Sequence, residues 1–90
     1  MRRVSLRRQR ENRLRRAIVA TLFEAAPYCA RCGCSGPLDA HELLSRARGG
    51  SITDPANIRL LDRACHRWVT EHPAEAAVEG WALSQYGGAA

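Results

Sequence analysis

The middle of the chain combines cysteine and histidine in spacings that suit metal ions. Cys29 and Cys32 are separated by two residues, so one tight turn can present both thiolates to a single Zn²⁺. Cys65 is distant in the sequence and can help to close the tetrahedron around that ion. His41 and His66 are then left for a second ion with a chemical role. The segment therefore predicts one structural and one chemically active metal ion.

The cysteine pair is also compatible with redox chemistry, but its surroundings favour metal. A thiol redox protein would carry the pair beside a thioredoxin-like βαβ pattern, which this chain does not show. No run approaches the roughly 20 apolar residues of a membrane span. No clear cleavage site follows the short apolar run at 17–23, so a secretory leader is not indicated. We expect a cytoplasmic protein with no membrane partner, in which such a pair binds metal.

The chain contains arginine but no lysine. The 90 residues include 14 basic and 9 acidic residues, for a formal net charge of +5. Arginine binds phosphate through a planar, bidentate fork, which favours a polyanionic partner. The lack of lysine has a plainer reading, coding bias in a GC-rich genome. Arginines are concentrated in residues 1–16, however, and this favours an arm on the DNA backbone over a solvated terminus.

Hydrophobic spacing and turn residues predict the elements that must position these side chains. Helical spacing of apolar residues predicts a basic amphipathic helix over 6–25, with a C-terminal half that packs on the domain. A turn rich in Cys, Gly and Ser follows at 29–36. Strands are predicted at 38–44 and 58–61, joined by a loop with strong turn signals.

Capping residues predict two further helices. Asp62 can cap a helix over 63–71, and Pro73 can begin another that Gly80 ends. The order is helix, knuckle, strand, loop, strand, helix, helix, with a ββα unit at its centre. So short a chain allows one domain, and metal support for its small core is expected.

Taken in order, the motifs resemble those of the HNH endonucleases, particularly the small phage-type members. The resemblance covers roughly residues 29 to 72 and consists of Cys29-x-x-Cys32, Leu38-Asp39-Ala40-His41-Glu42, Arg46-Ala47-Arg48-Gly49-Gly50, Asn57-Ile58-Arg59-Leu60-Leu61 and Cys65-His66. It implies an α+β fold, a small ββα-metal (HNH) domain with a zinc knuckle and flanking N- and C-terminal helices. The implied parts are a basic helical arm at 1–26, the HNH domain at 27–72, and a C-terminal helix with a flexible tail at 73–90.

The resemblance also implies an activity, metal-dependent hydrolysis of DNA phosphodiester bonds that leaves a 3′-hydroxyl and a 5′-phosphate. His41 and His66 match the ligands of the catalytic ion, which would be Mg²⁺, Mn²⁺, Ni²⁺ or Zn²⁺. That ion would orient the phosphate and stabilise charge on the leaving oxygen. Asn57 matches the family's middle residue, which braces the first strand or in some members binds the ion; we assign it the bracing role.

Glu42 departs from the family, whose members usually carry a histidine there as general base. A carboxylate is a weaker base than imidazole. We rank Glu42 first as the base or a water-orienting group. It could instead be a further metal ligand, or His41 could be the base while the ion sits on other groups. The remaining reading is a solvent-facing acid in a nuclease that has lost activity.

The zinc knuckle departs from the family as well, because Asp62 stands where a second Cys-x-x-Cys pair would begin. Beside Cys29, Cys32 and Cys65, the fourth ligand must be Asp62, Cys34 or water. Cys34 offers sulfur, but its closeness to Cys32 strains a common tetrahedron. Zinc accepts carboxylate oxygen, and Asp62 occupies the family position. We therefore favour Asp62, with helix capping as its other explanation.

Three arginines are expected near phosphate: Arg46, Arg48 and Arg67. Gly49 and Gly50, which follow Arg48, permit close approach of a phosphate backbone. Trp68 and Trp81 are expected to cover the core rather than stack on bases. The implied partners are DNA, contacted mainly through its backbone, and, in a phage-like setting, terminase or other genome-processing proteins in a bacterial or phage-infected host cell. The alternative function is a catalytically weak or inactive zinc-containing nucleic-acid-binding module.

Overall fold

The structure, a computed structural model, describes residues 5–83 of the chain. Its elements are the helix α1 (Leu6–Ala25), the strands β1 (Leu38–Glu42) and β2 (Ile58–Asp62), and the helices α2 (Arg63–Glu71) and α3 (Pro73–Glu79). The predicted α+β class is confirmed, as is the order of the elements. The first residues of the predicted arm and the predicted tail at 87–90 lie outside the described range.

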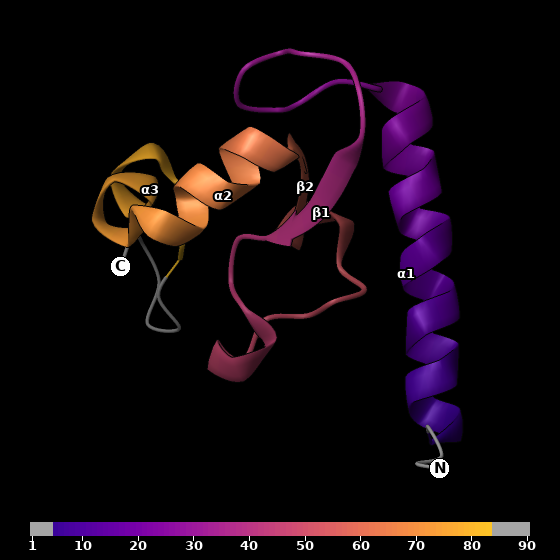
Figure 1. Cartoon of the computed structure of the whole chain (residues 1–90). Helices are drawn as coiled ribbons and strands as arrows, with labels where there is room; N and C mark the ends of the chain where they lie inside the picture. The colour runs from indigo at the N-terminus through magenta and orange to yellow at the C-terminus, as the bar shows by residue number, and fades with distance from the viewer. Residues whose placement is uncertain (1–4, 84–90) are drawn as a thin grey trace, which may run out of the picture.

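The long helix α1 lies along one side of the hairpin, while α2 and α3 lie on the other side (Figure 1). Ser5 caps the N-terminus of α1, because its hydroxyl accepts a hydrogen bond from the Arg8 amide at 3.1 Å. No residue of α1 is fully buried. Ile18 and Leu22 are half-buried, and Phe23 is exposed. The predicted packing of the C-terminal half is therefore shallow.

The two strands form an antiparallel hairpin in which Leu38 pairs with Asp62 and Glu42 pairs with Ile58. Successive strand residues face opposite sides of a sheet. Asp39 and His41 therefore share one face, and Glu42 lies on the other. Strand β1 ends two residues before the predicted boundary at 44, where hydrogen bonds to Asn57 replace regular pairing.

A small core lies between the hairpin, the cysteine turn and the two C-terminal helices. Its buried cluster consists of Cys29, Leu61, Cys65, Val69 and Ala76. Trp68 and Trp81 pack against this cluster, which confirms their expected role as core covers. Two of the five cluster members are cysteines, so the core and the candidate metal ligands are parts of one structure.

Local signals set the ends of α2 and α3 as expected. Asp62 Oδ1 accepts a hydrogen bond from the Cys65 amide at 2.7 Å, which caps α2. Pro73 begins α3, and Gly80 ends it with φ of +89°, a conformation that favours glycine. Within residues 5–83, no helix has both the length and the apolar character that crossing a membrane would require.

Candidate functional site

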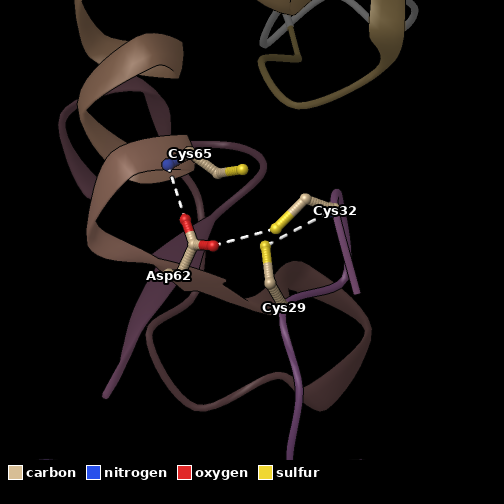
Figure 2. A group of neighbouring side chains, drawn as sticks. All are labelled: Cys29, Cys32, Asp62 and Cys65. Carbon is tan, nitrogen blue, oxygen red and sulfur yellow. Dashed lines mark hydrogen bonds between the residues drawn. The ribbon is translucent and has the colours of Figure 1, made fainter. Parts of the chain in front are cut away.

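Three cysteines and one aspartate converge where the cysteine turn meets the start of α2 (Figure 2). The ligand atoms of Cys29, Cys32, Asp62 and Cys65 all lie within 4.8 Å of one another. A tetrahedral ion with bonds of about 2.3 Å to sulfur separates its sulfur ligands by about 3.8 Å. We call these residues the Cys3Asp group. It could hold a metal ion, and it is the only such group of three or more ligands within the described residues.

The turn that carries two of these cysteines is folded around sulfur. The backbone amides of Arg31 and Cys32 each lie 3.4 Å from Cys29 Sγ. The Gly33 amide donates to the Cys29 carbonyl at 2.9 Å, and Gly33 itself has φ of +80°. Amides that point at a thiolate stabilise its negative charge. The turn therefore has the arrangement expected of a metal knuckle.

The thiols of the group differ in how readily they ionise, and burial raises the pKa of the Cys65 thiol. Burial works against a Cys29 thiolate, but hydrogen bonds from the backbone amides of Asp62, Cys32 and Arg31 lower its pKa to about 7. The Cys32 thiol donates to Asp62 Oδ2 at 2.8 Å. This bond raises the pKa of the Cys32 thiol and lowers that of the Asp62 carboxyl. Because sulfur and carboxylate share one proton, a metal ion that binds here displaces it.

Asp62 is placed for both of the roles that the sequence presents as alternatives, helix cap and metal ligand. Its Oδ1 caps α2, while its Oδ2 faces Cys32 in the Cys3Asp group. Cys34 is exposed and does not belong to that group. The geometry therefore favours Asp62 over Cys34 as the fourth ligand.

A second constellation brings β1 and α2 together. The rings of His41 and His66 meet edge to face, with centroids 5.4 Å apart. His66 Nδ1 lies 3.3 Å from Asp39 Oδ2. The side chains of Asp39 and His66 remain 37% and 35% exposed, so a ligand from solution can reach them. We call Asp39, His41 and His66 the histidine cluster.

The sequence interpretation missed Asp39. It lies two residues before His41, and strand periodicity alone places both residues on one face. That signal was available in the sequence, but the family motif directs attention to the residue that follows the histidine.

When the rings of His41 and His66 are neutral, their hydrogen-bond partners specify the tautomers. His41 Nε2 lies 2.6 Å from the carbonyl oxygen of Trp81. A carbonyl oxygen only accepts, so His41 Nε2 carries the proton and Nδ1 keeps a lone pair. By the same argument His66 donates from Nδ1 to Asp39, which leaves a lone pair on its Nε2. Each ring thus offers one nitrogen that can accept a proton or bind a metal ion.

Glu42 does not join the histidine cluster, because successive strand residues face opposite ways. Its carboxylate lies on the α1 side of the hairpin, 3.5 Å from Arg15 Nη1. The same guanidinium nitrogen donates to the Ile52 carbonyl at 3.0 Å. The structure therefore gives the expected role of Glu42 as base or water-orienting group no geometric support, and it assigns this residue a contact between α1 and the hairpin.

Asn57 braces the loop that connects the two strands. Its Oδ1 accepts from the Leu44 amide at 2.8 Å, and its Nδ2 donates to the carbonyls of Leu44 and Ser51, both at 2.9 Å. The side-chain amide is thus engaged with the backbone. These contacts agree with the bracing role rather than with metal binding.

Gly50 lies against the same part of the loop, and we predict that Gly50→Ala destabilises the protein. A methyl group there would overlap the backbone of Leu44 and Ser45. Overpacking of this kind typically costs about 1–3 kcal/mol, measurable as a lower free energy of unfolding in urea. Gly49→Ala is the matched comparison, because Gly49 has φ of +94° but open space around its Cβ position. A loss at position 50 no larger than the loss at position 49 would contradict the close packing of this loop.

The three arginines expected near phosphate are all exposed: Arg46, Arg48 and Arg67. Arg46 lies 3.5 Å from Glu11 of α1, which connects the loop to the long helix. Arg48 and Arg67 have no ion-pair partner within residues 5–83. Arg67 directly follows His66 in the chain, so it is the nearest in sequence to the histidine cluster.

Comparison of this chain with protein-family models, with curated proteins and with solved structures gives no match. The resemblance to the HNH endonucleases accordingly rests on the motifs of the sequence.

Proposed function

We propose that the protein is a metal-dependent DNA endonuclease of the HNH type that hydrolyses phosphodiester bonds to a 3′-hydroxyl and a 5′-phosphate. The observation that carries the proposal is the histidine cluster, in which Asp39 and His41 of β1 meet His66 of α2. The cluster is partly open to solution and separate in composition from the Cys3Asp group. One centre would therefore support the fold while the other performs chemistry.

The Cys3Asp group is proposed to hold a structural Zn²⁺. Three sulfur donors and one oxygen donor suit zinc, which accepts both in tetrahedral sites. The hard ions Mg²⁺ and Ca²⁺ prefer oxygen donors, so the composition of the group argues against them.

In the histidine cluster we propose His41 as the general base. Its Nδ1 keeps a lone pair because Nε2 donates to the Trp81 carbonyl. His66 would contribute Nε2 as a metal ligand, with its ring oriented by Asp39. A divalent ion held there would orient the scissile phosphate and stabilise the charge that develops on the leaving oxygen. Glu42 takes no part in this scheme, because it contacts Arg15.

Exposed arginines would hold the DNA backbone. Arg48 and Arg67 have no acidic partner within residues 5–83, and the same is true of four exposed arginines of α1: Arg8, Arg10, Arg13 and Arg16. Contacts of this kind neutralise phosphates without reading bases. Weak sequence preference and affinity that falls steeply with salt are therefore expected.

Nicking of supercoiled plasmid by the full chain tests the proposal. We expect nicked product with Mg²⁺, Mn²⁺ or Ni²⁺, none with EDTA, and 5′-phosphorylated ends that DNA ligase can reseal. His66→Ala should abolish nicking, because it removes the proposed ligand. His72→Ala is the matched control: His72 is exposed and stacks on Trp68 outside the cluster, so nicking should persist.

Two outcomes would count against the proposal. If wild-type protein binds DNA but does not nick it with any of these ions, the alternative of a catalytically inactive nucleic-acid-binding module is favoured. If nicking persists in His66→Ala, the activity comes from another site or from a contaminant.

A further inference from the structure

We propose that Glu79 is a positioning residue for His41. It holds Trp81 so that the Trp81 carbonyl fixes the His41 ring in the tautomer with a free Nδ1. The part of this inference that concerns cleavage rests on the proposed function. The part that concerns the state of the ring rests on the contacts of these residues alone.

The carbonyl of Trp81 is a long-range partner for His41, supplied by the segment that follows α3. The distance from His41 Nε2 to this oxygen is 2.6 Å, across 40 positions of sequence. Nothing within β1 fixes the ring at this nitrogen. The tautomer of His41 therefore depends on how the segment after α3 is held.

Several contacts hold this segment to α3 and to the end of β1. The Trp81 amide donates to the Ala76 carbonyl at 2.9 Å, after the turn at Gly80. The Leu83 amide donates to the Leu43 carbonyl at 2.8 Å. The indole Nε1 of Trp81 donates to Glu79 Oε1 at 2.9 Å. Only the last of these contacts involves a charged side chain, and that side chain has a second partner.

The second partner of Glu79 is Arg31, which lies between Cys29 and Cys32 in the cysteine turn. Its Nε donates to Glu79 Oε1 at 2.9 Å and its Nη2 donates to Oε2 at 3.3 Å, so the pair is bidentate. The guanidinium also lies 3.8 Å from the centroid of the Trp68 ring and donates to Cys65 Sγ at 3.6 Å. A planar group held on several sides is well placed to fix a carboxylate.

Arg31, Glu79 and Trp81 thus form a continuous set of contacts from the Cys3Asp group to His41. One end of the set touches a proposed metal ligand, Cys65, and the other end touches the proposed base. Removal of the Glu79 carboxylate breaks this set of contacts but removes no residue of the Cys3Asp group or of the histidine cluster. Glu79 therefore acts on His41 only through Trp81.

Nitrogen NMR of the His41 ring in Glu79→Ala tests the inference directly. The full chain is studied in buffer without added divalent ions, and long-range proton–nitrogen correlations report which ring nitrogen carries the proton. Wild-type protein should show one tautomer, protonated at Nε2. Glu79→Ala should shift the two ring nitrogens toward averaged values. With Mg²⁺ added, its nicking rate should fall by roughly tenfold, the lower range of effects for residues that orient a functional histidine.

Two further variants serve as a control and as a second test of the inference. Glu75→Ala is the matched control, since Glu75 also lies on α3 but contacts none of the residues involved; it should leave both readouts unchanged. Trp81→Phe removes the indole donor while keeping an aromatic ring on the core, and it should shift the His41 nitrogens in the same direction. Because this variant is conservative, it covers the case in which Glu79→Ala does not fold.

The outcomes separate the two proposals. A shifted His41 tautomer in a protein that never nicks DNA supports the positioning role and contradicts the proposed function. The positioning role is overturned by a different result. In that result wild-type protein nicks DNA, while Glu79→Ala and Trp81→Phe have the same His41 nitrogen signals and nicking rates as Glu75→Ala.

Discussion

Replacement of Cys65 by serine is expected to abolish cooperative folding of the protein and to prevent binding of the zinc proposed for the Cys3Asp group. Cys65 is buried, belongs to the core cluster and contributes one ligand atom to the Cys3Asp group. Apparent binding energies of structural zinc are about 10–16 kcal/mol in small zinc domains, which is as large as or larger than the total stability of a typical domain, about 5–15 kcal/mol. A core this small has little to replace that contribution. Zinc content by mass spectrometry and a thermal melt followed by circular dichroism measure both effects.

Cys34→Ser is the matched control, because Cys34 is exposed and lies outside the group. It should retain stoichiometric zinc and the wild-type melting temperature. If Cys34→Ser loses the metal and Asp62→Ala keeps it, the fourth ligand is Cys34 and the assignment made from the geometry is wrong. Chelation of wild-type protein with a strong zinc chelator should reproduce the effect of Cys65→Ser.

The two roles of Asp62 can be separated within the same experiment. Asp62→Asn keeps an oxygen that can accept from the Cys65 amide, so the cap on α2 survives while the ligand loses its charge. Asp62→Ala removes both. The difference in stability between these variants measures the cap, for which about 1 kcal/mol is typical. Both variants should bind zinc more weakly, and that loss of affinity measures what the Asp62 carboxylate contributes as a ligand.

The elements of this fold were predictable from sequence because their signals are local. Asp62 and Pro73 mark the beginnings of α2 and α3, and Gly80 marks an end, each through contacts within one helical turn. The Cys3Asp group was predictable for a related reason, since two of its members share one turn and the other two flank the start of one helix. Neighbouring residues determine the geometry within each pair, whereas the contact between the two pairs, Cys32 with Asp62, spans 30 positions and was expected from the order of the motifs.

The partners of the histidine cluster were not predictable in the same way. The contacts of His66 with Asp39, His41 with Trp81 and Arg31 with Glu79 span 27, 40 and 48 positions. They depend on strand register and on how α2 and α3 dock, which residue spacing does not encode directly. The side of the sheet that Glu42 faces is an intermediate case. Strand alternation predicts that Glu42 faces away from the side on which His41 lies. The family pattern instead suggested that these two neighbouring residues act together at one site.

His41→Ala is expected to lower the rate constant of DNA nicking by about 10²–10⁴-fold, the usual contribution of a general acid or base. The same substitution at Glu42 should change it by less than about threefold. The physical reason is orientation: the His41 ring meets that of His66 of α2, whereas Glu42 pairs with Arg15 of α1. Single-turnover nicking at saturating Mg²⁺ measures the rates, and a DNA-binding assay checks that both variants still bind.

Arg15→Ala distinguishes a structural effect at Glu42 from a chemical one. Partly exposed ion pairs contribute at most about 1 kcal/mol to stability, so Glu42→Ala should lower the melting temperature slightly. Arg15→Ala should lower it somewhat more, because it also removes the hydrogen bond to the Ile52 carbonyl. A rate in Glu42→Ala as low as that of His41→Ala, with Arg15→Ala unaffected, would identify the carboxylate as the base. Because Glu42 faces α1 and not His66 in this structure, that result would also require β1 to lie differently in the active protein. The comparison of these three variants therefore tests the chemistry and the register of the hairpin together.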